Sequence, residues 1–150
     1  MGRTEFGGWV LSTMRLTCIV DASFCPETKA AAYAIWISGH PDGKITQAGV
    51  FKQHCETSTD AEAFGVVNAL WLAKRHGGTD VLVQCDCLQA LPRGRDIWVR
   101  LYPGEAMQFS LRHVKGHTKN SAPRFYVNRW CDKTAKALMR AKRQEIYHGI

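Results

Sequence analysis

The sequence has 150 residues, of which 45% are hydrophobic and 22% are charged, and its formal net charge at pH 7 is +7. This composition excludes a disordered chain and predicts one hydrophobic core, and no run approaches the ~18 apolar residues of a membrane span. The positive charge favours a polyanionic partner, for which nucleic acid is the obvious candidate. Most of the six cysteines lie in apolar periodic segments, so we expect reduced thiols in a soluble, cytoplasmic monomer.

The first half of the chain reads as a leader followed by three strands. Residues 1–15 show no clear period, and we expect a loosely ordered leader before a single domain over residues 16–150. Residues 16–21 form an apolar, β-branched run that predicts a buried strand ending in Asp21. Residues 30–37 and 44–54 predict two more strands, and short turns between the three indicate an antiparallel meander.

A helix and a fourth strand follow the meander. Thr59 and Glu62 have the spacing of a capping box, no proline interrupts the chain up to His76, and two glycines then end the helix. Glu62 is the only charge in residues 61–73, so the helix should be buried on more than one side. Residues 81–86 repeat the buried strand that ends in Asp, and the strand–helix–strand order implies a right-handed crossover to a parallel neighbour.

The last third of the chain completes the predicted sheet. Residues 87–102, interrupted by proline and glycine, predict one or two brief helices, and residues 107–114 predict a fifth strand. A final helix from about Pro123 carries a buried stripe, with Asn128 and Asp132 on a different, common face. The order predicts an α/β fold: a mixed five-stranded sheet with three antiparallel strands, then two parallel strands, and helices on both faces.

The acids carry the predicted chemistry. Asp21 and Asp86 end neighbouring parallel strands at the same sheet edge, and the first turn of the crossover helix brings Glu62 close. Three converging carboxylates repel one another, and a pair of divalent cations relieves that repulsion; oxygen ligands of this kind suit magnesium or manganese. Taken singly, each acid has an ordinary alternative: Glu62 as a helix cap, Asp86 as a turn residue, and Asp132 as a solvated helix charge.

Five segments, all in family order, resemble ribonuclease H of type 1. The resemblance covers nearly the whole chain from Leu16 to about Arg140. Its most specific parts are the Lys-Gly-His loop that ends at His117 and the Asn-x-x-Cys-Asp helix start that ends at Asp132. The matching segments are residues 19–23, 57–62, 83–86, 114–117 and 128–132.

The resemblance implies an endonuclease that cuts the RNA strand of RNA–DNA hybrids with two Mg²⁺ ions, or Mn²⁺ in their place, and leaves 5′-phosphate and 3′-hydroxyl ends. The implied metal-binding and catalytic acids are Asp21, Glu62, Asp86 and Asp132. His117, on a mobile loop, is the implied fifth catalytic residue. The expected substrate-binding residues are Ser23, Ser58, Thr59, Gln89, Lys115 and Asn128.

Several positions depart from the family pattern. Ala22 replaces the usual glycine after the first acid, Ser58 and Thr59 replace asparagines, and Gln89 lies one place later than usual. The segment between Asp86 and the histidine loop is too short for a basic protrusion. Because relatives use these positions to contact the hybrid, two alternatives stay open. One is a nuclease for structured or double-stranded RNA or for DNA, and the other is a silent nucleic-acid-binding module.

Two further patterns carry weaker signals. Cys85-x-Cys87 is compatible with zinc, but it lacks a second pair at ligand spacing, which favours buried thiols. Trp98, between Arg95 and Arg100, is the tryptophan that we would consider for contact with nucleic acid.

Overall fold

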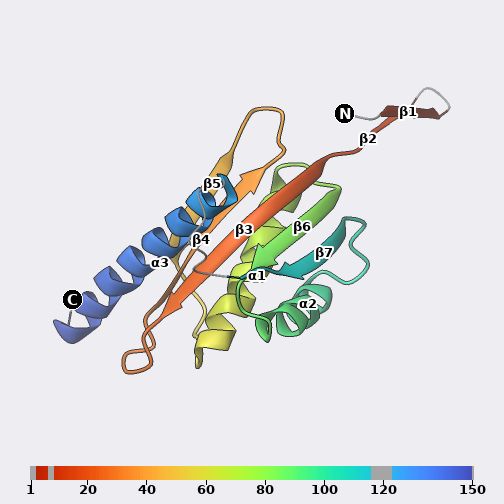
Figure 1. The fold of residues 1–150 in the computed structure, drawn as a ribbon. Coiled ribbons are helices and arrows are strands. Elements are labelled where there is room, and N and C mark those ends of the chain that lie inside the picture. The colour runs from red at the N-terminus through yellow and green to blue at the C-terminus, as the bar shows by residue number, and fades with distance from the viewer. Residues whose placement is uncertain (1–2, 7–8, 116–122, 150) are drawn as a thin grey trace.

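Figure 1 shows the computed structural model of the protein, which describes residues 3–6, 9–115 and 123–149, with side chains for 13–115 and 126–149. Among these residues, no helix has both the length and the apolar character that crossing a bilayer requires. In chain order the elements are β1 (Arg3–Phe6), β2 (Trp9–Ser12), β3 (Arg15–Phe24), β4 (Ala31–Ser38), β5 (Ile45–Val50), α1 (Ser58–Arg75), β6 (Asp80–Cys85), α2 (Ala90–Leu101), β7 (Gln108–His113) and α3 (Pro123–Tyr147).

The main sheet has five strands in the order β5-β4-β3-β6-β7. Strands β3, β4 and β5 pair antiparallel, whereas β6 pairs parallel to both β3 and β7. The mixed sheet predicted from the sequence is therefore confirmed. Its parallel part exists because α1 carries the chain from the edge strand β5, over one face, back to the other side of β3.

Helices cover both faces of the sheet, as expected. Helices α1 and α2 lie on one face and α3 on the other, along β3, β4 and β5 (Figure 1). Side chains along β3 point alternately to the two faces of the sheet. Leu16, Cys18 and Val20 join the core beneath α1, while Ile19 packs against the cluster beneath α3. The next residue on the α3-facing side is Asp21, so the first acid points away from the main core.

Two local expectations needed correction. The capping box of α1 is formed by Thr57 and Asp60 rather than by Thr59 and Glu62, because the helix already begins at Ser58. The third strand ends at Val50, well before residue 54. Of the one or two brief helices expected in residues 87–102, the structure has one, of 12 residues; Pro92 falls in its first turn, where a missing N–H costs no helical hydrogen bond.

The predicted leader contains a short hairpin. Strands β1 and β2 pair antiparallel, and the hairpin projects beyond the start of β3 (Figure 1). Strand β3 begins at Arg15, one residue earlier than the predicted domain boundary. The loose ordering of residues 1–15 stays a prediction.

Helices α1 and α2 approach closely at Gly94. A Cβ atom added there would lie 3.1 Å from the Cβ of Val66 and 3.3 Å from the carbonyl oxygen of Ala63. We expect Gly94→Leu to lower the free energy of unfolding by about 1–3 kcal/mol, because the larger side chain would push the two helices apart. Urea denaturation measures this loss. The control is Val99→Leu on the exposed side of α2, which should change stability by no more than about 0.5 kcal/mol; equal midpoints for both variants would contradict the close packing.

Candidate metal centre

The register of the parallel strands brings two acids together. Ile19 of β3 lies opposite Gln84 of β6, so two residues further on Asp21 and Asp86 reach the same face and the same edge of the sheet. Strand β6 ends at Cys85, which leaves Asp86 just beyond the last strand residue. The predicted meeting of the two strand-end acids is thus a direct consequence of the pairing.

Glu62 reaches the same edge from the first turns of α1. The Thr57–Asp60 capping box determines the residue at which that helix begins, and therefore where Glu62 lies relative to the sheet. The backbone N–H of Ala22 donates to Glu62 Oε1 at 3.3 Å and to Asp21 Oδ1 at 2.9 Å. One amide of β3 therefore holds the two carboxylates against each other.

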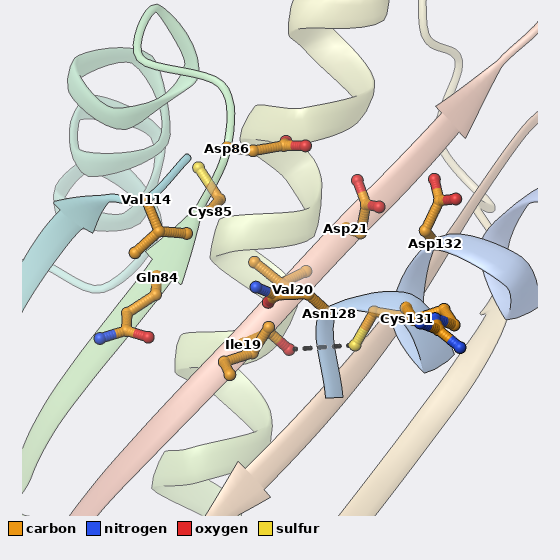
Figure 2. A pocket seen from close by; sticks show the side chains of 11 residues that line it. Ile19, Val20, Asp21, Gln84, Cys85, Asp86, Val114, Asn128, Cys131 and Asp132 are labelled. Carbon is orange, nitrogen blue, oxygen red and sulfur yellow. Dashed lines mark hydrogen bonds between the residues drawn. The ribbon is translucent and has the colours of Figure 1, made fainter. Parts of the chain in front are cut away.

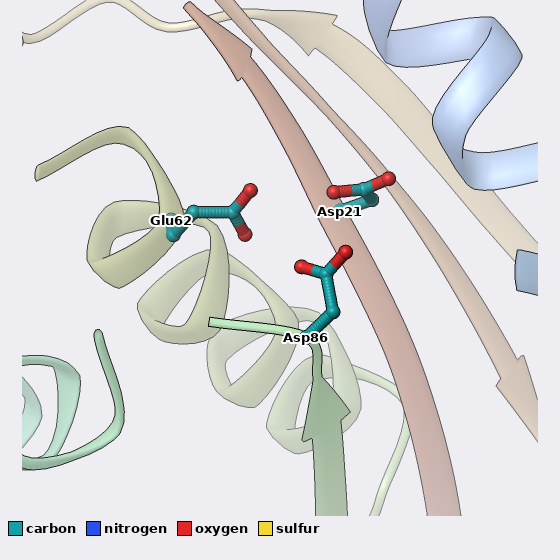
Figure 3. Close-up of side chains that lie close together, drawn as sticks. All are labelled: Asp21, Glu62 and Asp86. Carbon is teal, nitrogen blue, oxygen red and sulfur yellow. The ribbon is translucent and has the colours of Figure 1, made fainter. Parts of the chain in front are cut away.

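Three carboxylates converge at this edge. One oxygen each from Asp21, Glu62 and Asp86 lies within 4.8 Å of the other two, and Figure 3 shows the three side chains pointing toward a common centre. Each residue is partly buried. Glu62 Oε2 is fully buried and has no hydrogen-bond partner among the described residues. A buried acceptor without a partner, beside two more carboxylates, is the environment that a divalent cation with oxygen ligands would satisfy.

The pKa values follow from this crowding. Burial and the neighbouring charges of Asp86 and Asp132 raise the pKa of Asp21 to about 7. Burial and the charges of Asp21 and Asp86 raise the pKa of Glu62 to about 9. Of the two acids, Glu62 therefore keeps its proton to the higher pH.

The fourth predicted acid lies beside this cluster. Asp132 comes from α3, which is anchored to β3 where the Cys131 thiol donates to the carbonyl oxygen of Ile19 at 3.7 Å. Figure 2 shows Asp132 next to Asp21, with both carboxylates pointing the same way. Asp132 is not one of the three mutually close acids, and its Oδ2 lies 3.1 Å from Lys136 Nζ. The fourth acid is therefore paired with a lysine of its own helix.

A cavity of about 260 Å³ adjoins the acids on the α3 side of the sheet. Asp21, Asp86 and Asp132 form its upper rim, and Gln84 and Asn128 supply amides from opposite walls (Figure 2). Asn128 and Asp132 therefore share a face of the helix, as their spacing predicted.

The expected substrate-binding residues come from several elements, and one of them, Asn128, lines the cavity beside the acids. Ser23 follows Asp21 on the same side of β3, and Thr59 lies in the first turn of α1. Ser58, Gln89 and Lys115 are exposed. Their roles stay predictions, and His117 lies outside the described residues.

Burial bears on two weaker signals of the sequence. Trp98 is 1% exposed and packs against Tyr102, so its proposed contact with nucleic acid is wrong; its spacing of four and eight residues from Gly94 and Ala90, which share the buried side of α2, was the available signal. Cys85 is a buried free thiol and Cys87 a partly buried one, which agrees with the reading that was favoured over zinc.

Sequence reasoning missed two ion pairs around the centre. Asp60, the capping residue, also binds Arg93 of α2 at 2.8 Å, which ties the first turn of α1 to the neighbouring helix. The second is the Lys136–Asp132 pair, for which the spacing of four residues on a helix was an available signal.

Known proteins resemble this chain in sequence and in fold. The family model described as reverse transcriptase-like matches residues 19–93, which is half of the chain and includes three of the four acids. A comparison with curated proteins finds no match.

Several solved structures have the same fold. RNase H1 from the halophilic archaeon Halobacterium salinarum NRC-1 is 18% identical, with a TM-score of 0.62 over 85% of this chain and 98% of that one. The N-terminal RNase H domain of a Mycobacterium tuberculosis protein, solved as a fusion with maltose-binding protein, is 14% identical, with a TM-score of 0.67 over 89% and 99%. LC11-RNase H1, solved in complex with an RNA/DNA hybrid, is 10% identical, with a TM-score of 0.63 over 85% and 98%.

Identities this low establish a shared fold and nothing finer. The family model covers the strands and the helix that carry Asp21, Glu62 and Asp86, and the mixed sheet has the arrangement of the solved RNase H domains. This chain therefore belongs to the reverse transcriptase-like family and folds as a compact RNase H-type domain.

Proposed function

We propose that the protein is a metal-dependent endoribonuclease that hydrolyses the RNA strand of RNA–DNA hybrids and leaves 5′-phosphate and 3′-hydroxyl ends. The observation that carries the proposal is the set of three carboxylates with oxygens within 4.8 Å of one another. A module that only binds nucleic acid gains nothing from crowding three repelling acids, so the cluster favours an enzyme. The complex of LC11-RNase H1 with an RNA/DNA hybrid supports the choice of substrate.

The residues present fit two Mg²⁺ or Mn²⁺ ions. Asp21, Glu62 and Asp86 would hold the first, since their oxygens already converge and one of them lacks a partner among the described residues. Asp132 would complete the second site together with Asp21, after Lys136 releases it. When bound, two such ions supply an activated water and stabilise the charge on the leaving oxygen.

The protein itself supplies position and charge. The Ala22 amide and the α1 cap hold the acids in place before substrate arrives, which reduces the reorganisation needed during the reaction. We propose that His117 assists proton transfer or product release, and that Lys115 and Asn128 contact the substrate near the acids. Ser23, Ser58, Thr59 and Gln89 are proposed to contact the substrate strands. We also propose a monomer in the reducing cytoplasm, which accords with six free cysteines.

The first prediction tests the substrate and the acids together. With Mg²⁺, the protein should cut end-labelled RNA–DNA hybrid in preference to double-stranded RNA and double-stranded DNA, and a chelator should stop cleavage. Asp21→Asn and Asp86→Asn should each lower the rate by roughly 100-fold or more while the circular dichroism spectrum is unchanged, because a metal ligand is lost. Asp42→Asn, in the exposed turn before β5, is the matched control and should retain full activity. If the protein cuts double-stranded RNA or double-stranded DNA in preference to the hybrid, the proposed substrate is wrong and the preferred duplex takes its place.

The second prediction concerns stability and pH. A carboxyl whose pKa is raised by folding stabilises the folded protein below its unfolded pKa, and this stability is lost as the pH rises through the folded pKa. For Asp21 and Glu62 the windows run from 3.8 to about 7 and from 4.5 to about 9. Without divalent cations, the wild type should therefore lose stability relative to Glu62→Gln as the pH rises from 5 to 9. Urea titrations at several pH values measure this difference.

Saturating Mg²⁺ serves as the control for that titration, because a bound cation replaces the proton as the neutralising charge. With Mg²⁺ bound, the wild type should then be more stable to urea than Glu62→Gln. If, without cations, the difference in the free energy of unfolding between the two proteins stays constant across the pH range, the acids do not repel one another as described.

The third prediction concerns binding. The formal charge of +7 and exposed basic residues such as Lys115 and Lys133 imply that affinity rests on phosphate contacts. The logarithm of the hybrid affinity should therefore fall linearly with the logarithm of salt concentration, and Lys115→Gln should reduce the slope by about one. Fluorescence anisotropy measures the slope. Affinity that is independent of salt would exclude binding through phosphates.

A further inference from the structure

An aromatic cluster lies on the α3 side of the sheet, at some distance from the acids. Trp36 of β4 stands between two residues of α3: its ring centroid lies 5.6 Å from that of Trp130 and 6.2 Å from that of Tyr126, both in edge-on arrangements. The ammonium group of Lys44 lies 4.6 Å from the centroid of Trp36. We call Trp36, Tyr126 and Trp130 the aromatic cluster.

The inner part of the cluster belongs to the core, but its outer part does not. Trp36 and Trp130 are partly buried against the small residues Ala34 and Ala135, which holds both rings in place. Tyr126 is 63% exposed, the largest exposure among the aromatic side chains described. The Tyr126 ring therefore contacts Trp36 in an edge-on arrangement while most of its surface is open to solvent.

The position of Tyr126 connects it with the proposed active site. It precedes Asp132 by six residues on the same helix, which is about 9 Å along the helix axis and about 120° around it. A nucleic-acid strand that follows the helix surface therefore needs at least about three nucleotides, at the spacing of a duplex strand, to reach from one residue to the other. Exposed basic side chains flank the path, with Arg129 and Lys133 on α3 and Lys44 at the cluster itself.

Together these features fit one kind of occupant. Aromatic faces stack on nucleobases regardless of sequence, and adjacent cations follow the phosphates, which is the arrangement found in proteins that bind single strands. Bases inside a duplex are already stacked and cannot reach an aromatic side chain. We propose that the aromatic cluster binds a single-stranded extension of the nucleic-acid substrate, with an unpaired base stacked on Tyr126.

This proposal rests on the proposed function. The nucleic-acid strand whose unpaired base stacks on Tyr126 would be the same strand that places a phosphate at the acids. It adds a preference that the acids alone do not give: hybrids with an unpaired end, such as those at a strand junction, would bind more tightly than blunt hybrids of the same length. An acidic protein partner is the competing occupant, and it would give no such preference.

The test compares blunt hybrids with hybrids that carry a single-stranded extension of about six nucleotides at either end. Affinity is measured by fluorescence anisotropy in a chelator, so that no strand is cut. In the wild type one of the two extensions should raise the affinity by at least about 5-fold, the effect of stacking one base. Tyr126→Ala should abolish this gain and Tyr126→Phe should keep it, because the ring and not the hydroxyl makes the contact.

The matched control is Tyr147→Ala. Tyr147 is also exposed and lies near the opposite end of α3, where its hydroxyl donates to Glu27 at 2.8 Å. This variant should keep the full gain from the extension. Because Tyr126 is mostly exposed, thermal unfolding of its alanine variant should match that of the wild type, which separates lost stacking from lost folding.

Two outcomes would overturn the proposal: no gain from either extension in the wild type, or a gain that survives in Tyr126→Ala. Cleavage of the blunt hybrid with Mg²⁺ is measured in parallel. If blunt hybrid is cut normally while the extension has no effect, the stacking site is wrong and the nuclease stands. If no hybrid is cut but the extension gain depends on Tyr126, the nuclease is wrong and the single-strand site stands.

Discussion

One constraint governs the edge of the sheet that carries the candidate metal centre: three partly buried carboxylates repel one another there. Asp21, Glu62 and Asp86 come from three different elements, and no one of them is in an unusual position by itself. Burial and their mutual repulsion raise the pKa of Asp21 to about 7 and that of Glu62 to about 9, so the fold stores electrostatic free energy that protons relieve partly and cations relieve better. An arrangement that costs stability in this way is expected at a functional site rather than in a purely structural part of a protein.

The rest of the structure keeps these acids from separating. The parallel pairing of β3 with β6 fixes Asp21 beside Asp86, and the capping residue Asp60, held by Arg93, fixes the start of the helix that carries Glu62. Because each constraint is a backbone register or a helix terminus, the geometry exists before any ligand arrives. The fourth acid differs, because Asp132 is held by an ion pair with Lys136 on its own helix.

Much of this arrangement could be predicted from the sequence. The apolar, β-branched run that ends in Asp21 and a strand–helix–strand order were enough to predict the mixed sheet and the meeting of the acids, because strand pairing determines where strand ends lie. The start of α1 was misjudged since Thr57–Asp60 and Thr59–Glu62 both have capping-box spacing, and only tertiary contacts decide between them. Trp98 was misjudged because flanking arginines say nothing about which side of a helix faces the core. The Arg93–Asp60 pair joins two helices, and no local pattern predicts it.

The central claim is that this edge of the sheet holds divalent cations, and anomalous diffraction from crystals grown with manganese tests it most directly. Manganese should occupy a position ligated by Asp21, Glu62 and Asp86, and a second position beside Asp132, with Lys136 displaced from that carboxylate. Crystals in excess manganese that show no ion among the three acids, or show ions only elsewhere on the surface, would contradict the claim.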